Sequence, residues 1–210
     1  DSGLRVKLAL VYEANELWDE AQAAWEHAIT MSEGSEESAG LGVLVYHRAL
    51  SLRQAGEIES AEALMRSAVE LAPQLAAAHY ELARSQLEVG ELEGAEASFK
   101  RASLLAPRSP DPITGLAFVC LGKDQYAEAE SLARKALGLE PTFKRARYGL
   151  GLALRGMGRL AEAERELTIG LGAKTRKIAD PLSNKIASYR TGYQSKITRA
   201  VGLVGAGNPA

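Results

Sequence analysis

An alanine recurs every 34 residues along most of the chain, and this spacing limits the possible folds more than any other feature of the sequence. Each alanine ends a similar short frame, such as Gly56-Glu-Ile-Glu-Ser-Ala61 and Gly90-Glu-Leu-Glu-Gly-Ala95. The recurring alanines are Ala61, Ala95, Ala129 and Ala163, and an earlier copy is centred on Ala21. A fixed period of a few tens of residues is typical of stacked supersecondary units. We therefore expect a repeat protein, stabilised by contacts between neighbouring units.

Each unit has the pattern of two helices joined by a tight turn. Apolar residues recur three and four positions apart on both sides of the turn, which is the period of an amphipathic helix. Glycine at positions 56, 90 and 158 can adopt the positive φ that ends a helix, and Asp124 takes its place in the fourth unit. The prolines at positions 73, 107 and 141 are expected to begin the next helix. Small side chains recur where two helices would approach closely, at Ala49, Ala83, Ala117 and Gly151 on first helices.

The units resemble the tetratricopeptide repeat, whose frame is W-x2-L-G-x2-Y…A-x3-F…P. One unit reads His79-x2-Leu82-Ala83-x2-Gln86, followed by Ala95-x3-Phe99 and Pro107. The resemblance covers about residues 4–175. It implies an all-α fold: an α-solenoid of antiparallel helix pairs in a right-handed superhelix, with first helices on the concave side. The expected repeats are 4–35, 42–75, 76–109, 110–143 and 144–177.

Residues 180–210 follow a different pattern. Asp180-Pro181 is typical of a helix start, with Asp as the N-cap and Pro at the first helical position. Apolar residues then recur in steps of three and four, which predicts one helix of about 25 residues ending near 205–207. We expect this helix either to cap the repeats or to lead into a sixth repeat. Because the chain begins at Asp1, we also expect it to be part of a longer protein.

The resemblance places peptide binding on the concave surface, whose lining follows from the repeat register. Tyr46, Tyr80 and Tyr148 share one repeat position. Tyr and Arg are favoured at protein interfaces because they combine large contact area with hydrogen bonding. The expected partner-binding residues are Tyr46, Leu50, Arg53, Tyr80, Arg84, Phe118, Arg145, Tyr148, Leu152 and Arg155. The alternative is that the tyrosines pack internally, against neighbouring helices or against the C-terminal helix.

The sequence contains no set of residues that suits catalysis or cofactor binding. His27, His47 and His79 lie at different repeat positions, without partners at the spacing of metal ligands, and we interpret them as surface or packing residues. Cys120 takes a packing position on a first helix and is interpreted as a buried apolar side chain. We therefore expect no enzyme activity, no cofactor and no metal. No apolar run approaches the ~18 residues that a membrane span needs.

The charges are divided unevenly along the chain. Residues 1–141 contain 12 Lys and Arg against 23 Asp and Glu, whereas residues 142–210 contain 13 against 4. This division favours an acidic protein partner, or self-association of an acidic N-terminal part with a basic C-terminal part, and the acidic remainder disfavours nucleic acid. A solvated surface with a local charge bias is the simpler alternative.

These observations predict a protein-interaction scaffold that binds a peptide or helix in a concave groove. Two alternatives remain: a docking or targeting segment of a larger enzyme whose catalytic domain lies outside this sequence, and a self-assembling structural module. The composition, rich in Ala, Gly and Arg, suggests a bacterial source. We expect a soluble protein, either cytoplasmic or periplasmic.

Overall fold

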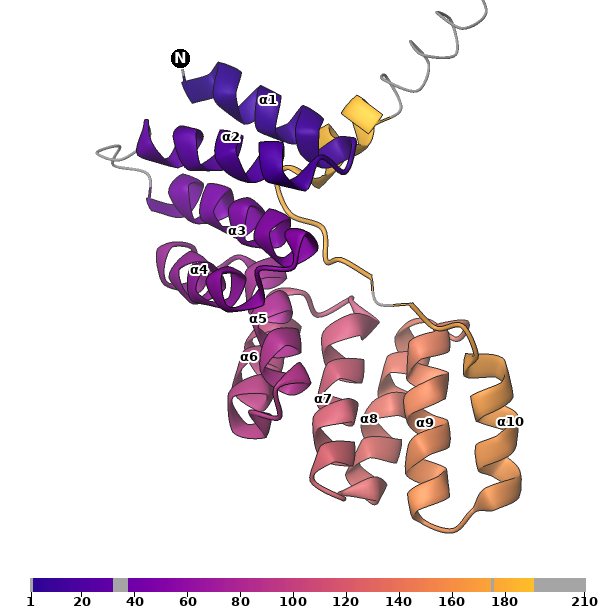
Figure 1. Ribbon diagram of the computed structural model, residues 1–210. Coiled ribbons are helices and arrows are strands. Elements are labelled where there is room, and N and C mark those ends of the chain that lie inside the picture. Colours follow the sequence, from indigo (N-terminus) through magenta and orange to yellow (C-terminus); the bar gives the residue numbers. More distant parts are fainter. Residues whose placement is uncertain (1, 32–37, 175, 191–210) are drawn as a thin grey trace, which may run out of the picture. The chain divides into compact units, whose positions relative to one another are not determined.

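The computed structural model describes residues 2–31, 38–174 and 176–190, and these residues are mainly helical (Figure 1). The helices are α1 (Ser2–Ala14), α2 (Trp18–Thr30), α3 (Ser38–Ala55), α4 (Ile58–Leu71), α5 (Ala76–Glu88), α6 (Leu92–Leu105), α7 (Pro110–Gly122), α8 (Tyr126–Leu139), α9 (Lys144–Gly156) and α10 (Leu160–Gly170). A further helical segment covers residues 183–190. The described residues contain no strand, and the predicted all-α fold class is confirmed.

Consecutive helices form five hairpins, from α1/α2 to α9/α10, and the turn inside each hairpin needs a residue with positive φ. Gly56, Gly90 and Gly158 supply it with φ of 96°, 82° and 78°. Asp124 has φ of 57° in the α7/α8 turn, where the repeat frame has Asp in place of Gly. Glycine suits this conformation because it has no Cβ, and Asp is among the few other residues that tolerate it.

The prolines between hairpins lie three residues earlier than the helix starts that they were expected to form. Pro73, Pro107 and Pro141 lie outside helices, whereas the next helices begin at residues 76, 110 and 144. The residue directly before each of these helices has extended dihedral angles, for example φ of −84° and ψ of 125° at Ser109. The proline therefore ends one hairpin, and the next helix starts after a residue with extended backbone. Before α7 this residue, Ser109, also caps the helix, since its side chain accepts from the Asp111 backbone N–H.

Small side chains lie where first and second helices meet. Ala49, Ala83 and Ala117 are fully buried. A Cβ added at Gly151 on α9 would lie 2.7 Å from the Leu167 Cγ atom of α10, which is closer than real contacts allow. The helices of this hairpin can therefore approach closely only because position 151 has no side chain.

The chain forms two compact units, which we describe separately. Unit 1 contains residues 1–72 and 180–210, and unit 2 contains residues 73–179. Unit 2 holds α5–α10, and its apolar residues form small clusters between neighbouring helices. One of these clusters contains Ala117, Ala133, Leu150, Leu154 and Ala163. A chain of local cores of this kind is expected for stacked repeats.

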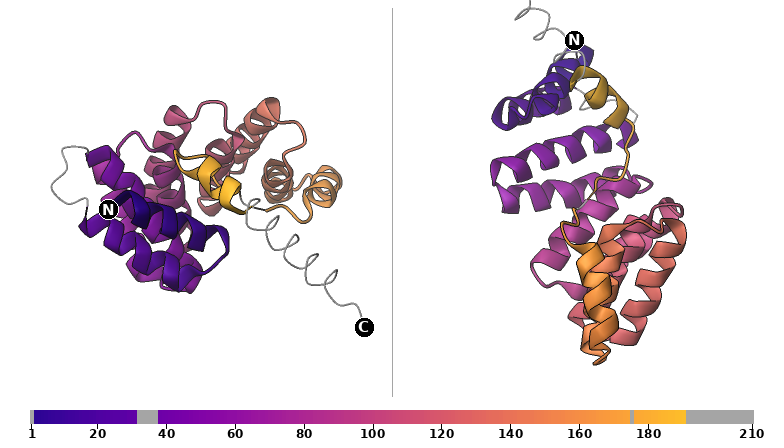
Figure 2. Two further views of the ribbon diagram at one scale, coloured as in Figure 1. Left: turned by 90° about the horizontal axis from the view of Figure 1, so that it is seen from above. Right: turned by 90° about the vertical axis from the view of Figure 1, so that its right-hand side faces the viewer.

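Unit 1 combines α1–α4 with a segment from the other end of the sequence. Its described part, residues 180–190, is called the C-terminal segment here; it lies beside α1 (Figures 1 and 2). Leu182 joins the core formed by Leu10 and Trp25. The Asp180 Oδ1 atom accepts a hydrogen bond of 2.8 Å from the Leu182 backbone N–H, as a residue that starts a helix does. The rest of the predicted long helix, residues 191–210, lies outside the described residues.

Candidate functional site

The first-helix face of unit 2 carries an accessible aromatic pair. Phe118 on α7 and Tyr148 on α9 have ring centroids 6.4 Å apart, inclined by 34°. Phe118 is half-buried, and Tyr148 is 39% exposed. Leu152 lies one helical turn after Tyr148 and is half-buried. We call Phe118, Arg145, Tyr148 and Leu152 the aromatic patch.

Arg145 is the positive group of the aromatic patch, and its guanidinium is fixed by two contacts. Its carbon Cζ lies 5.1 Å from the centroid of the Phe118 ring, within the range of a cation–π interaction. Its Nη1 atom donates a hydrogen bond of 2.8 Å to the Tyr80 hydroxyl. Because the guanidinium is already held in place, less side-chain entropy is lost when a partner binds it.

Tyr80 itself is fully buried, and its hydroxyl accepts the hydrogen bond that holds Arg145 in the patch. Its ring centroid lies 5.8 Å from that of Phe99 on α6. Burial raises the pKa of Tyr80 to about 12, against the smaller opposite effect of Arg145. The hydroxyl therefore stays protonated, and its oxygen accepts the hydrogen bond from Arg145. Tyr80 thus packs internally against neighbouring helices, as in the alternative to partner binding given above.

The two remaining predicted residues of unit 2 are Arg84 and Arg155. Arg84 on α5 is half-buried, with its Nη1 atom 2.6 Å from Glu81 Oε2 and its Nη2 atom 3.6 Å from Glu88 Oε1. Arg155 on α9 is exposed and borders an open hollow of about 260 Å³ on α9 and α10. The hollow is lined by Arg155, Leu160, Ala163, Glu164, Leu167, Thr168 and Leu171.

In unit 1 the residues at the corresponding positions are covered. Tyr46 is fully buried, Leu50 is 2% exposed and Arg53 is half-buried. A partner could therefore touch Tyr46 or Leu50 only after some part of unit 1 moved. The three tyrosines at one repeat position thus have two different environments: Tyr46 and Tyr80 are packed, and Tyr148 is open to solvent.

A buried charged triad, which the sequence did not reveal, lies beside Tyr46. The His47 Nδ1 atom lies 2.9 Å from Glu13 Oε2, and its Nε2 atom lies 2.9 Å from Asp180 Oδ1. The side chains of these three residues are 1%, 2% and 4% exposed. His47 was interpreted as a surface or packing residue; it does pack, since its ring stacks on Trp25 at 5.2 Å, but it also joins two carboxylates.

The protonation of His47 follows from these partners. Burial alone lowers the pKa of His47, but the hydrogen bonds and negative charges of Asp180 and Glu13 outweigh burial and raise it to about 9. Burial likewise opposes ionisation of Asp180, and His47 outweighs it, lowering the pKa of Asp180 to about 2. At neutral pH an imidazolium therefore donates both of its N–H groups, one to each carboxylate.

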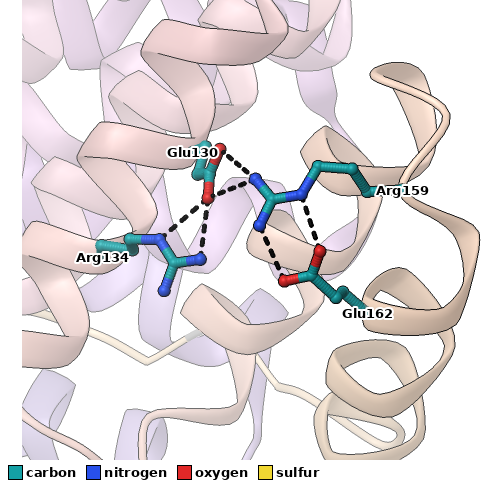
Figure 3. Close-up of polar contacts among 4 residues, drawn as sticks. All are labelled: Glu130, Arg134, Arg159 and Glu162. Carbon is teal, nitrogen blue, oxygen red and sulfur yellow. Dashed lines mark hydrogen bonds and ion pairs between the residues drawn. The ribbon is translucent and has the colours of Figure 1, made fainter.

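Several basic residues of the C-terminal third have acidic partners within the chain. Arg159 at the start of α10 contacts Glu130 of α8 at 3.0 Å and Glu162 at 2.7 Å, and Arg134 contacts the same Glu130 at 2.7 Å (Figure 3). Other pairs of the same kind are Arg147 with Glu166, Arg176 with Asp111 and Glu140, and Arg190 with Glu16. Part of the uneven division of charge is therefore balanced by contacts inside one molecule.

The pairs on second helices repeat with the sequence period. Glu130 and Arg134 on α8 correspond to Glu96 and Lys100 on α6, which also form an ion pair. Lys123, from the turn of the next hairpin, contacts Glu96 at 2.7 Å, as Arg159 contacts Glu130. These pairs are partly exposed, so each contributes little alone, but together they link neighbouring hairpins.

The described residues favour none of three further features as a functional site: a metal site, the Cys120 thiol and membrane-spanning helices. No group of three or more His, Cys, Asp and Glu among them could hold a metal ion. Burial raises the pKa of the Cys120 thiol, which disfavours the reactive thiolate. No described helix is both long and apolar enough to cross a membrane.

Comparisons with known proteins agree with this architecture. The family model described as "Tetratricopeptide repeat" matches residues 52–117 and 121–175. No curated protein sequence matches the chain.

Among solved structures, MamA from Desulfovibrio magneticus RS-1 is similar with a TM-score of 0.71 and 15% identity, over 81% of this chain and 93% of that one. A second MamA structure gives 0.68 and 19%, over 81% and 90% of the two chains. YrrB, described as a TPR protein with an unusual peptide-binding site, gives 0.66 and 15%, over 81% and 85%. At these identities the likeness concerns the fold.

Proposed function

Because the chain belongs to the tetratricopeptide repeat family, we propose that it is a non-catalytic protein-binding scaffold whose aromatic patch on unit 2 receives a peptide or helix. The observation that carries this proposal is the exposed Tyr148, paired with Phe118 and next to a fixed arginine. The fold supports the proposal because stacked helix pairs place the first helices of unit 2 in one row. The likeness to YrrB supports a peptide as the class of partner.

The chemistry of the aromatic patch indicates what a partner should carry. Phe118, Tyr148 and Leu152 offer an apolar surface, and Tyr148 adds a hydroxyl that can pair with a polar group at the edge. Arg145 offers donors to a carboxylate, which matches the proposed acidic partner. A peptide with an acidic side chain next to an aliphatic or aromatic one would satisfy both parts of the patch.

Affinity capture from a lysate tests this proposal when the patch is compared with a matched surface. The patch variant is Phe118→Ala/Tyr148→Ala, and the control variant is Leu104→Ala/Leu139→Ala, which removes exposed apolar side chains from second helices α6 and α8. We expect the control variant to retain the proteins captured by the wild-type chain and the patch variant to lose at least one of them. Equal capture by the two variants would show that the patch is not the binding surface.

Replacing Tyr46 or Tyr80 would not serve as this test. Both side chains are fully buried, so their removal leaves cavities and lowers stability whether or not a partner binds. Tyr148 is the member of the tyrosine set whose removal changes the surface with little change to the core.

A further inference from the structure

The C-terminal segment is attached to unit 1 in the manner of a bound peptide. Two of its backbone hydrogen bonds, from Ser183 N–H to Asp180 O and from Ile186 N–H to Leu182 O, run within the segment. Its described contacts with α1 and α3 are made by side chains at a few points. Residues 171–174 and 176–179, which connect it to α10, contain no helix. The segment is thus a short helix on a tether.

The first point of attachment recognises a carboxylate. The Asp180 Oδ1 atom receives hydrogen bonds from His47 Nε2 at 2.9 Å and from the Leu182 backbone N–H at 2.8 Å. Glu13 holds the opposite side of the His47 ring at 2.9 Å and so fixes the direction in which Nε2 donates. Without an anion at this place, His47 and Glu13 would still form a pair that water can solvate.

The second point of attachment recognises an aliphatic side chain two residues later. Leu182 is 9% exposed and packs with Leu10 and Trp25 in the core of unit 1. Ile186 and Tyr189 follow on the same side of the helix and are partly buried against this cluster. At the far end, the Arg190 Nε atom donates to the Ala14 carbonyl oxygen at 3.2 Å.

These contacts involve few residues of the segment. Among its described residues, the side chains of Asp180 and Leu182 are buried, and the others are half-buried or exposed. The strongest polar contact is a desolvated ion pair, which gives register and specificity more readily than net stability. Removal of the segment would open the His47–Glu13 pair and the apolar cluster of Leu10 and Trp25 to solvent.

We propose that the α1/α3 face of unit 1 is a second peptide-binding site, which residues 180–190 occupy as a ligand in cis. In trans the site takes a peptide of the same chemistry: a carboxylate side chain, then an aliphatic side chain two residues later, at the start of a helix. The segment in cis competes with that peptide, because its covalent connection makes its binding intramolecular. Weak peptides in trans therefore do not displace the segment, whereas peptides that match the site better than the segment does can displace it.

A labelled peptide with the sequence of residues 179–190 provides the probe, and fluorescence polarisation measures its binding to the full chain. The open variant is Asp180→Ala/Leu182→Ala, which weakens both points of attachment of the segment in cis. We expect the open variant to bind the probe at least tenfold more tightly than the wild-type chain does. A probe with Asn in place of Asp180 should bind the open variant at least tenfold more weakly, since it lacks the charge that His47 recognises.

Histidine variants of the open chain distinguish the site from a change in folding. His47→Leu added to the open variant should abolish binding of the probe, whereas His27→Ala, which removes an exposed histidine from α2, should leave binding unchanged. Circular dichroism establishes that each variant keeps its helical content. The proposal is overturned if the wild-type chain and the open variant bind the probe equally, if neither binds it, or if the Asn probe binds as well as the original.

Discussion

Raising the pH should destabilise unit 1 by titrating His47. The pKa of His47 is about 9 in the folded chain, against an ordinary value of 6.5. The folded state therefore keeps a proton that the unfolded state loses between these two values. The stabilisation that this proton provides is fully present below pH 6.5. It is lost as the pH rises through 9, at up to about 1.4 kcal/mol per pH unit. Between pH 6 and pH 9 the free energy of unfolding should fall by about 3 kcal/mol.

Tryptophan fluorescence measures this loss in unit 1 alone. The chain has two tryptophans, Trp18 and Trp25, and both lie on α2. Trp25 is also stacked on the ring of His47, so its emission responds to the charge of that ring. Urea titrations at pH 6 and at pH 9 give the two free energies of unfolding. Asp180 stays ionised throughout this interval, because its pKa is lowered to about 2.

The His47→Gln variant is the control, because glutamine keeps polar contacts but cannot titrate. We expect this variant to be less stable than the wild-type chain at pH 6 and to lose little further stability at pH 9. The reasoning is refuted if wild type and variant show the same difference between the two pH values. It is equally refuted if the wild-type chain becomes more stable as the pH rises.

Three further predictions concern unit 2 and are measured by thermal or urea unfolding followed by circular dichroism. Gly115→Ala should lower the free energy of unfolding by about 1–3 kcal/mol, because the new Cβ would lie 2.4 Å from the buried Phe99 ring. At Gly138 nothing lies within 4 Å of an added Cβ, so Gly138→Ala should raise the free energy of unfolding by about 0.5–1 kcal/mol. Equal effects of the two changes would contradict the packing described. Arg159→Ala should lower the urea midpoint slightly at low salt and by less in 1 M NaCl, because salt screens the ion pairs that it removes. A loss of stability that is the same at both salt concentrations would argue against an electrostatic role. Tyr80→Phe should cost about 1 kcal/mol, because the guanidinium that donates to its hydroxyl loses its acceptor; an unchanged midpoint would show that water replaces the hydroxyl at no cost.

The repeat architecture could be predicted because each hairpin is specified by residues within a single period. A positive φ at Gly56 and Asp124 and complete burial of Ala83 follow from turn and packing rules that act over a few residues. The limits of the individual repeats remain predictions. The prolines were expected to begin the next helices but lie three residues before them, because residues with extended backbone separate each proline from the helix.

The candidate site could be predicted only in part, because accessibility depends on contacts distant in the sequence. The register gives Tyr46 and Tyr148 the same position, yet one is buried and the other exposed. The Asp180 carboxylate accepts a hydrogen bond from the Leu182 backbone N–H, as predicted for a residue near a helix start, but the helix begins at residue 183 and not at Pro181. The contact of Asp180 with His47, which lies 133 residues earlier, has no signal in the repeat pattern. Two acidic side chains near a histidine become informative only when the fold brings them together.

The separation of His47 and Asp180 in the sequence also determines the order in which the protein can be completed during synthesis. The ribosome adds about 5–20 residues per second, so the histidine waits roughly 7–27 s for a partner that lies 133 residues further on. Unit 2, an uninterrupted stretch, is fully translated before Asp180 leaves the exit tunnel. Unit 1, most of which is synthesised first, therefore gains its last segment only after unit 2 has been synthesised.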